Sequence, residues 1–407
     1  MKILLYMSSG FDAFSPSLHL YSALIQDLVA SGHQVHLIES HSLGINPDIP
    51  QYLEKLERFS YETIAIGAPK KTEFVKRYLT GVKYCFKSIS VFRHQKNFNV
   101  MMVQSCPWAP FAVTFAKWFV RCPVVYNSQD MFPGSSIANG AMTQKWMQWF
   151  FFKFQKIAYR NADVITVISE DMKQKVMEQG VPENKIRIIV NWYDDKNVRE
   201  IPWEENLFVK KYSMSKDVFY VQFAGTMGFN FDYKMVLKVA EILYNCKDII
   251  FQMIGVGSQK DIFMAEVERR KLDNIVFYPL EPKEMVPHVY SACSVCLIPL
   301  PRGVIGNSVP SKAGLLMACR RVIVTSADED SEYNAMFARE KIGVACSCDD
   351  PEGVANAILK LKNDCTLRES LADRAKAYGK KYYSRSVNTA KYERLYCKLG
   401  NNKDLQH

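Results

Sequence analysis

The sequence predicts an α/β fold made of two domains, each built on a parallel sheet. Short apolar runs alternate with longer amphipathic segments in both halves of the chain, which is typical of strands that alternate with helices. Residues 194–216 interrupt this alternation with many charges and a proline, and we interpret them as a linker. A chain of 407 residues is long enough for two such domains, each with its own core.

In the first half of the chain, local sequence signals predict the strands and the ends of the helices. Continuous apolar runs predict buried strands, and Ser31-Gly32 ends the first helix because glycine suits the residue after a helix. Ser169 caps a further helix, which Gly180 ends. The expected strands are residues 2–6, 34–39, 100–104, 124–127, 164–168 and 186–190, and the expected helices are residues 17–30 and 170–179.

The alternation restarts after the linker. The expected strands are residues 219–224, 249–254, 275–278, 295–299 and 322–325, with helices at 233–244 and 311–319 and helical character over 368–399. Parallel sheets bind ligands beyond the carboxyl ends of their strands. We expect an N-terminal domain at 1–195, a C-terminal domain at 196–384, and a helix at 385–407 that packs back toward the N-terminal domain.

Composition favours anionic partners and a reducing compartment. The formal net charge is +10, which attracts nucleotides and anionic membrane surfaces, although no basic run or RNA motif indicates nucleic acid. No uncharged apolar stretch is long enough to span a bilayer, and the apolar run Ile3–Met7 is too short for a signal peptide. Cys346 and Cys348 have no matching second pair, so we expect no metal site and a cytoplasmic protein with reduced thiols.

The stretch Gly306–Glu332 carries the clearest indication of a ligand site. It predicts a loop, a helix start at Pro310, a short apolar helix and a buried strand, with Lys312 beside the free N–H groups of the helix. A nucleotide diphosphate suits such a place, but an ordinary strand-loop-helix explains the stretch equally well. Gly225 and Gly228 follow another expected strand, where a glycine loop admits phosphates or simply makes a turn.

A second stretch favours a membrane surface. Residues 145–160 combine aromatic and basic side chains, as interfacial helices on anionic lipid do. A buried helix whose cations reach water is the alternative. The residues expected to face lipid are Lys145, Trp146, Trp149, Phe150, Lys153, Lys156 and Arg160.

Several short motifs, in order along nearly the whole chain, resemble one enzyme family. They are Gly32-His33-x-Val35, Gln129–Pro133, Ala162–Met172, Asn191–Asp194, Phe223–Gly228, Ile254–Gly257, Leu272–Phe277, Ser291–Cys293, Leu297–Leu300 and Val309–Lys312. Together they are similar to bacterial family 4 glycosyltransferases, in particular the WbuB- and WcaI-like enzymes of polysaccharide assembly. The resemblance implies the GT-B fold, in which two Rossmann-like domains face each other across a cleft, and retention of anomeric configuration without a metal or other cofactor.

The resemblance also implies roles for matching residues. Lys312 would stabilise the leaving diphosphate, and Asp130 would act on the acceptor hydroxyl, although a loop or cap role explains Asp130 as well. Gly10 and Gln129 would line the acceptor side of the cleft, with Gln129 standing where relatives often have histidine. The expected donor-binding residues are Gly225, Thr226, Gly228, Arg302, Asn307, Ser308, Pro310, Ser311 and Glu332.

The sequence departs from the family at one important place. Many members hold the donor with a Glu-x7-Glu pair, and alignment on Pro-Ser-Lys puts those positions at Asn307 and Leu315. Neither is acidic, so the usual hydrogen bonds to ribose are lost unless Lys312, Arg302 and Glu332 compensate.

We expect a retaining glycosyltransferase that uses a nucleotide-diphosphate sugar to extend a polyprenyl-diphosphate-linked oligosaccharide in capsule, O-antigen or exopolysaccharide synthesis. It would associate peripherally with the inner face of the membrane. Two alternatives remain open at this point: a UDP-sugar 2-epimerase of the same fold, and a non-catalytic subunit of a polysaccharide assembly complex.

Overall fold

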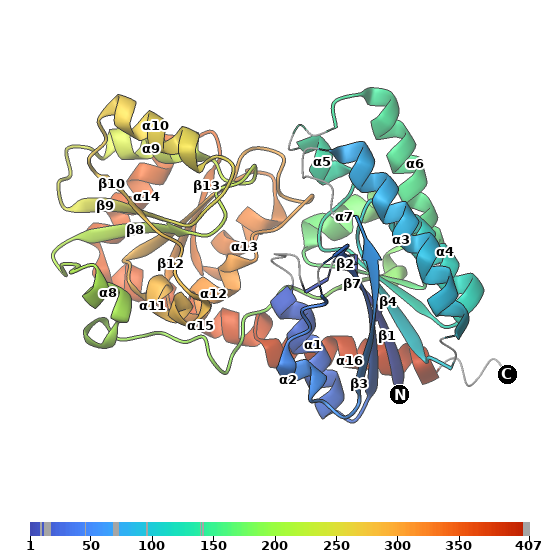
Figure 1. Cartoon of the computed structure of the whole chain (residues 1–407). Helices are drawn as coiled ribbons and strands as arrows, with labels where there is room; N and C mark the ends of the chain where they lie inside the picture. Colours follow the sequence, from blue (N-terminus) through green and yellow to red (C-terminus); the bar gives the residue numbers. More distant parts are fainter. Residues whose placement is uncertain are drawn as a thin grey trace. The chain divides into compact units, whose positions relative to one another are not determined.

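The computed structural model describes residues 1–8, 10–11, 18–44, 46–67, 73–94, 97–138, 140 and 142–401. The chain divides into two compact units. Unit 1 comprises Met1–Val190 and Asn388–His407, and unit 2 comprises Asn191–Val387. Each unit holds one parallel sheet with helices on both of its faces (Figure 1).

Unit 1 is built on a seven-stranded sheet with the order β3-β2-β1-β4-β5-β6-β7. Its strands are β1 (Lys2–Tyr6), β2 (Gln34–Ser42), β3 (Phe59–Ile66), β4 (Val100–Gln104), β5 (Val124–Asn127), β6 (Val164–Val167) and β7 (Ile186–Ile188). Its helices are α1 (Leu18–Ala30), α2 (Gln51–Glu54), α3 (Phe74–His94), α4 (Ala109–Phe115) with the π-helical turn η1 (Ala116–Val120), α5 (Gly134–Ala138), α6 (Lys145–Asn161), α7 (Glu170–Glu178) and the 3-10 turn η2 (Glu183–Lys185).

Unit 2 is built on a six-stranded sheet with the order β10-β9-β8-β11-β12-β13. Its strands are β8 (Phe219–Ala224), β9 (Ile249–Ile254), β10 (Ile275–Tyr278), β11 (Val295–Pro299), β12 (Val322–Ala327) and β13 (Gly343–Ser347). Its helices are α8 (Leu207–Lys211), α9 (Tyr233–Ile242), α10 (Lys260–Arg270), α11 (Val286–Ser291), α12 (Lys312–Ala318), α13 (Glu332–Glu340), α14 (Pro351–Asn363) and α15 (Cys365–Tyr382), with 3-10 turns η3 (Trp203–Glu205) and η4 (Lys283–Met285).

Both sheets reverse their strand order at one point, between β1 and β4 in unit 1 and between β8 and β11 in unit 2. All the strand pairs are parallel, and the central strands are buried on both faces, which explains their continuous apolar sequences. At a reversal the helices on either side lie on opposite faces, so the carboxyl ends of the two strands border a crevice suited to a ligand.

The last helix, α16 (Arg385–Asn401), completes unit 1. Tyr392 and Tyr396 on this helix are fully buried, and Asn127 at the end of β5 donates a hydrogen bond of 2.6 Å to the Tyr392 hydroxyl. Glu393 lies 3.2 Å from the His33 ring. These contacts join α16 to the rest of unit 1.

Two sequence-based expectations need correction. The stretch expected to be a linker contains η3 and α8, because Asn206 caps α8 and Phe208 is fully buried against unit 2. The expected helix 311–319 is shorter, since α12 runs over Lys312–Ala318 and Pro310 lies before its cap residue Ser311. Proline therefore does not occupy the first turn of α12.

Candidate active site

Most of the expected donor residues of unit 2 lie where the strand order reverses, between β8 and β11. Gly225, Thr226 and Gly228 follow β8 directly, and the loop from Arg302 to Ser311 joins β11 to α12. Asp232, which ends the glycine loop, donates its N–H to the carbonyl of Pro299 at the end of β11 over 3.0 Å. The two loops are thus joined at one place.

Lys312 is the central feature of this place. Its ammonium lies 3.6 Å from the centre of the Phe223 ring on β8 and forms no ion pair with any described residue. Burial lowers the pKa of Lys312 to about 7, because the interior favours the neutral amine over the charged form. An unpaired lysine so enclosed is costly for stability alone and indicates a site for an anion.

Glycine at position 225 is required by this arrangement. A Cβ added to Gly225 would lie 2.6 Å from Lys312 Nζ, and the backbone φ of Gly225 is +149°, which other residues rarely adopt. Gly255, after β9, would place its Cβ 2.0 Å from the Gly225 carbonyl oxygen. The backbones of both loops therefore approach each other closely and leave Lys312 facing bare main chain.

The loop after β11 is fixed mainly by its own contacts. Arg302 forms an ion pair with Asp349, while both carboxylate oxygens of Asp328 accept from the Gly303 N–H at 2.9 and 3.0 Å. The Asn307 amide donates to the Gly303 carbonyl over 2.9 Å. Ser308, which is half-buried, donates its N–H to Val304 over 3.0 Å.

The remaining donor candidates lie on both sides of α12. Pro310 is half-buried and Ser311 is exposed beside Lys312, whereas Glu332 begins α13 and pairs with Arg339 at 2.7 Å. Leu315 packs against an apolar cluster of unit 2. The structure thus brings Lys312 and the glycine loop together, and it engages Arg302 and Glu332 in ion pairs of their own.

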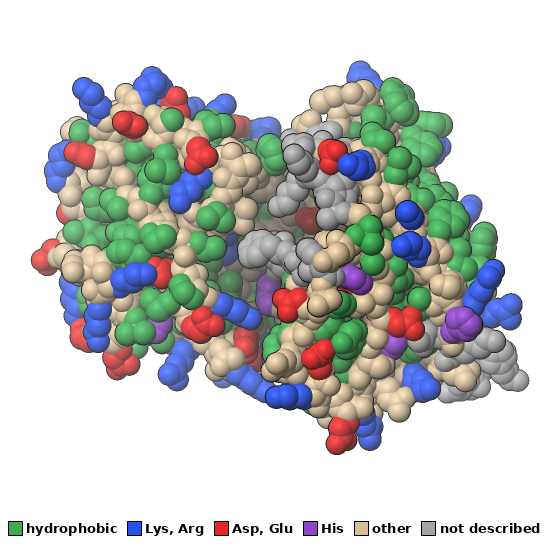
Figure 2. Space-filling view, in the orientation of Figure 1, with side chains coloured by type: hydrophobic (Ala, Val, Ile, Leu, Met, Phe, Trp, Pro, Cys, Tyr) green, Lys and Arg blue, Asp and Glu red, His purple; other side chains and the backbone are tan. Residues whose placement is uncertain are grey.

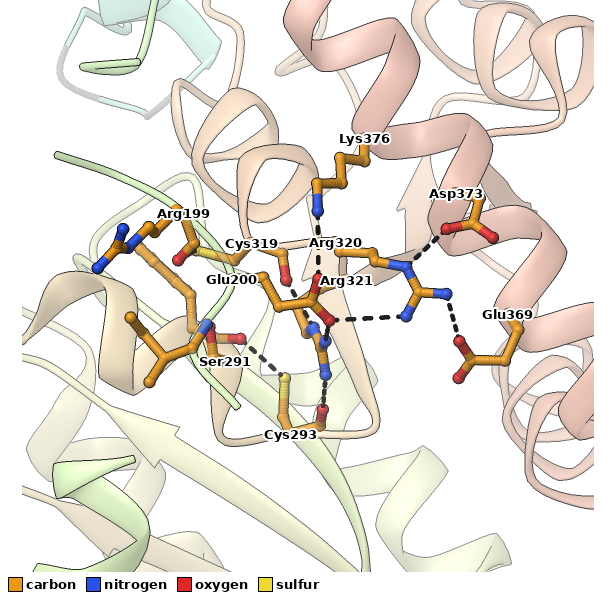
Figure 3. A network of polar contacts seen from close by, with 12 residues as sticks. Arg199, Glu200, Ser291, Cys293, Cys319, Arg320, Arg321, Glu369, Asp373 and Lys376 are labelled. Carbon is orange, nitrogen blue, oxygen red and sulfur yellow. Dashed lines mark hydrogen bonds and ion pairs between the residues drawn. The ribbon is translucent and has the colours of Figure 1, made fainter. Parts of the chain in front are cut away.

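A charged network holds the other end of α12 (Figure 3). Glu200 accepts from Arg321 over 3.1 Å and also pairs with Arg320 and Lys376. Arg320 pairs in addition with Glu369 and Asp373 on α15, and the Arg321 guanidinium donates to the Cys293 carbonyl over 2.9 Å. The network fixes the turn between α12 and β12, and with it the helix that begins at Lys312.

The acceptor-side candidates lie at the carboxyl edge of the unit 1 sheet. Gly10 is buried after β1, and Gln129 and Asp130 follow β5. The Gln129 amide donates to Asn127 over 2.9 Å, and its N–H donates to the Ser105 hydroxyl over 3.1 Å. Asp130 is exposed.

Sequence reasoning missed two polar residues at this edge. Gln104 ends β4 and accepts from the Ser8 N–H at 2.9 Å, and Glu39 on β2 is fully buried and accepts from the Phe11 N–H at 3.1 Å. A polar residue in or at the end of an otherwise apolar strand was the signal that could have found both.

Three neighbouring helical segments of unit 1 form an extended aromatic and basic surface, here called the three-helix face: α3, α4 with η1, and α6. None of these segments contains an aspartate or glutamate. Ring contacts link them, including Phe86 with Phe115 at 5.3 Å and Phe111 with Phe154 at 5.1 Å. Figure 2 shows green and blue side chains gathered along this right-hand side of the molecule.

Helix α6 has one buried side and one exposed aromatic and basic side, so it fits both a helix at a membrane surface and a helix packed against the sheet. Phe151, Gln155, Ala158 and Tyr159 are buried on one side. On the other side Trp146, Trp149 and Phe150 are 70%, 65% and 46% exposed. The four basic residues Lys145, Lys153, Lys156 and Arg160 are exposed.

Within the described ranges, no helix has the length and apolar character needed to cross a bilayer. The same ranges contain no cluster of three or more His, Cys, Asp or Glu side chains able to hold a metal ion.

Comparison with known proteins gives matches in both units. Residues 21–192 match the glycosyl transferase 4-like domain family, and residues 219–364 match the glycosyl transferases group 1 family. The probable glycosyltransferase WbjE of Pseudomonas aeruginosa is 25% identical over 63% of this chain and 62% of its own length. The putative colanic acid biosynthesis glycosyl transferase WcaI of Escherichia coli K12 is 22% identical over 91% of this chain and 95% of its own.

Solved structures share the fold over almost the whole chain. Sucrose-phosphate synthase from Thermosynechococcus elongatus superposes with a TM-score of 0.74 at 15% identity, covering 98% of this chain and 99% of its own. Anabaena HepE in complex with UDP has a TM-score of 0.71 at 13% identity, covering 98% and 100%. The two parallel sheets therefore form a GT-B fold, as expected. The chain belongs to the family 4 glycosyltransferases, which are retaining enzymes.

Proposed function

We propose that this glycosyltransferase moves a sugar from a nucleotide-diphosphate donor, bound by unit 2, to a lipid-linked oligosaccharide in capsule, O-antigen or exopolysaccharide synthesis. The observation that carries the donor half is Lys312, an enclosed and unpaired amine beside the bare backbone of Gly225. HepE, a structural neighbour, binds UDP-glucose, and WcaI is named for colanic acid biosynthesis.

The chemistry follows from the charge that the reaction develops. Cleavage of the sugar–phosphate bond leaves a negative charge on the diphosphate, which a protonated Lys312 would stabilise more strongly in the transition state than in the bound donor. The glycine loop lets the donor's phosphates approach the backbone. On the acceptor side, Asp130 would accept a hydrogen bond from the attacking hydroxyl, with Gln129 and Gly10 lining the same edge.

The proposal of a lipid-linked acceptor is supported by the three-helix face. A lipid-linked acceptor lies at a membrane, so its enzyme has to reach the bilayer surface. Exposed tryptophans and phenylalanines among lysines and arginines, without a single acidic residue, suit the boundary between anionic headgroups and acyl chains. We therefore propose peripheral association with the inner face of the membrane through this surface.

The test of the donor assignment compares two lysines of unit 2. Lys312→Met, which keeps the length of the side chain, should lower kcat for transfer and for donor hydrolysis by roughly 30- to 1,000-fold, as loss of one transition-state contact does. The matched control is Lys238→Met, at an exposed position on α9. Circular dichroism should be unchanged in both. Equal rates for the two variants would remove Lys312 from the reaction, and no turnover by the unmodified protein with any UDP, GDP or dTDP sugar would favour a non-catalytic subunit.

A further inference from the structure

Two adjoining hollows lie at the end of α6 in unit 1, outside the residues assigned above to the reaction. Their volumes are about 480 and about 450 Å³, and they share Arg160 and Lys185. The first is lined by Lys153, Lys156, Ile157, Tyr159, Arg160, Gln179, Gly180, Val181, Pro182 and Lys185. The second is lined by Lys117, Trp118, Arg160, Asn161, Ala162, Asp163 and Lys185.

The first hollow is strongly basic. Four of its lining residues are cations and none is acidic. Lys185 is used internally, because its ammonium donates to the carbonyls of Tyr159 and Arg160 at 2.6 and 3.0 Å and so caps the end of α6. Lys153, Lys156 and Arg160 are exposed and form no ion pair within the part of the chain that the structure describes. Three uncompensated charges therefore surround the hollow.

Part of the lining of the same hollow is apolar. Ile157, Val181 and Pro182 line it together with the basic side chains. In the second hollow, Asp163 is already paired with Lys117 and accepts from the Val124 N–H. Arg160 and Lys185 line both hollows, and Lys185 is engaged with backbone carbonyls, so Arg160 is the cation of both linings that has no ion pair among the described residues. A ligand that fits here carries one or two negative charges next to an apolar part.

The two hollows and the acceptor-side candidates lie at opposite edges of the unit 1 sheet. Asp163 directly precedes β6, Lys185 directly precedes β7, and η1 ends shortly before β5. All three strands are parallel, so these residues lie at the amino edge of the sheet, whereas Gly10, Gln129 and Asp130 lie at the carboxyl edge. The hollows also adjoin the three-helix face, since α6 carries Trp149, whose ring lies 5.8 Å from Lys153 Nζ.

We propose that the hollow bounded by Lys153, Lys156, Arg160 and Lys185 binds the phosphate of an anionic membrane phospholipid. The basic side chains complement the phosphate, the apolar part of the lining accommodates the glycerol and the first acyl carbons, and the exposed tryptophans of α6 enter the same leaflet. The inference rests on the proposed membrane association and adds a defined headgroup site to a diffuse basic surface.

The test uses two double variants of the full chain with equal loss of charge. Lys156→Gln/Arg160→Gln changes the hollow, and Lys83→Gln/Lys145→Gln removes two exposed cations of the three-helix face away from it. Binding is measured with phosphatidylcholine vesicles with and without phosphatidylglycerol, with a short-chain phosphatidylglycerol below its micelle concentration, and with inorganic phosphate.

The monomeric short-chain lipid should bind the unmodified protein and the control variant equally, and the hollow variant roughly thirtyfold more weakly. If the two variants bind the lipid equally weakly, binding depends on diffuse surface charge, and the proposed headgroup site is overturned. Inorganic phosphate that binds as tightly as the lipid would overturn the assignment to a phospholipid. Failure of the unmodified protein to bind anionic vesicles would instead overturn the proposed membrane association, and this inference with it.

Discussion

At the scale of single residues, Lys312 combines a cost to the fold with the role proposed for it in the reaction. Its pKa of about 7 lies far below the ordinary 10.5, so the donor-free protein holds this lysine partly neutral at neutral pH. Between these two pH values the unfolded chain carries a proton that the folded chain lacks. The contribution of Lys312 to stability therefore improves as pH rises from about 7.

Donor binding should reverse that preference for the neutral form. A diphosphate beside Lys312 favours the ammonium and raises its pKa, so the protein should take up close to one proton per donor at about pH 8 and much less at about pH 6. A nucleotide-diphosphate sugar is the right probe, because its phosphates do not titrate near neutrality. Calorimetry in buffers of different ionisation enthalpy measures the uptake. Uptake that persists in Lys312→Met would assign the proton to another group.

Leu315 leads to a prediction about the donor's ribose. An apolar side chain cannot accept hydrogen bonds from the ribose hydroxyls, so UDP and 2′-deoxy-UDP should bind with affinities within about threefold of each other. Leu315→Glu should raise the preference for UDP roughly tenfold, the value of one hydrogen bond to a charged acceptor. Titration of both nucleotides against both proteins measures it, and a strong preference for UDP in the unmodified chain would show that another residue reads the ribose.

At the scale of elements, the turn between α12 and β12 is held by charge. Arg320 has a φ of +55°, a conformation that favours glycine, yet its guanidinium joins Glu200, Glu369 and Asp373. The ion pairs offset the strained backbone and position α12, whose first residue is Lys312. A glycine would relieve the backbone but leave three carboxylates without this partner.

Two substitutions at Arg320 separate these effects. Arg320→Ala and Arg320→Gly both lose the ion pairs, but only glycine relieves the left-handed φ. The glycine variant should therefore have a free energy of unfolding about 1 kcal/mol above that of the alanine variant, while both fall below the unmodified protein. Chemical denaturation measures the three values. Identical stability of the two variants would mean that the turn changes its conformation once the guanidinium is gone.

The sequence was sufficient to predict the buried strands, but it was not sufficient to predict several elements at the surface. Central parallel strands such as β4 and β8 show as continuous apolar runs because both of their faces are covered. The edge strand β3, with Glu62 in its middle, and the basic helix α3 have no such pattern, and neither was expected. The three-helix face was consequently foreseen on α6 and not on α3.

The same limit applies to the site. Lys312 and Gly225 stand in recognisable motifs, but their contact joins positions far apart in the chain, as does the pairing of Arg302 with Asp349. Local sequence patterns indicate candidate site residues. The groups that shift the pKa of such a residue, or that pair with a guanidinium, are brought to it by the tertiary fold and cannot be predicted from local patterns.

At the scale of the whole molecule, the two proposed tasks, donor binding and membrane association, fall to different units. The donor candidates all lie in unit 2, and the three-helix face lies in unit 1. A change that acts on surface charge alone should therefore affect the two halves of the reaction differently.

Salt provides such a change. High ionic strength screens the exposed cations of the three-helix face, so transfer to a lipid-linked acceptor in anionic vesicles should fall by roughly tenfold or more. Transfer to a short water-soluble acceptor should fall much less, because the enclosed Lys312 is screened weakly. Parallel rate measurements with both acceptors make the comparison. An equal loss with both would place the salt effect at the donor site.

The return of α16 to unit 1 has a consequence for synthesis on the ribosome. Unit 2 is one continuous segment, whereas unit 1 begins at Met1 and is completed by Asn388 and the residues after it. Most of unit 1 therefore waits, with the places of Tyr392 and Tyr396 unfilled, until α16 has left the ribosome. The second half can fold meanwhile. A premature stop before α16 would thus damage the part of the protein that was made first.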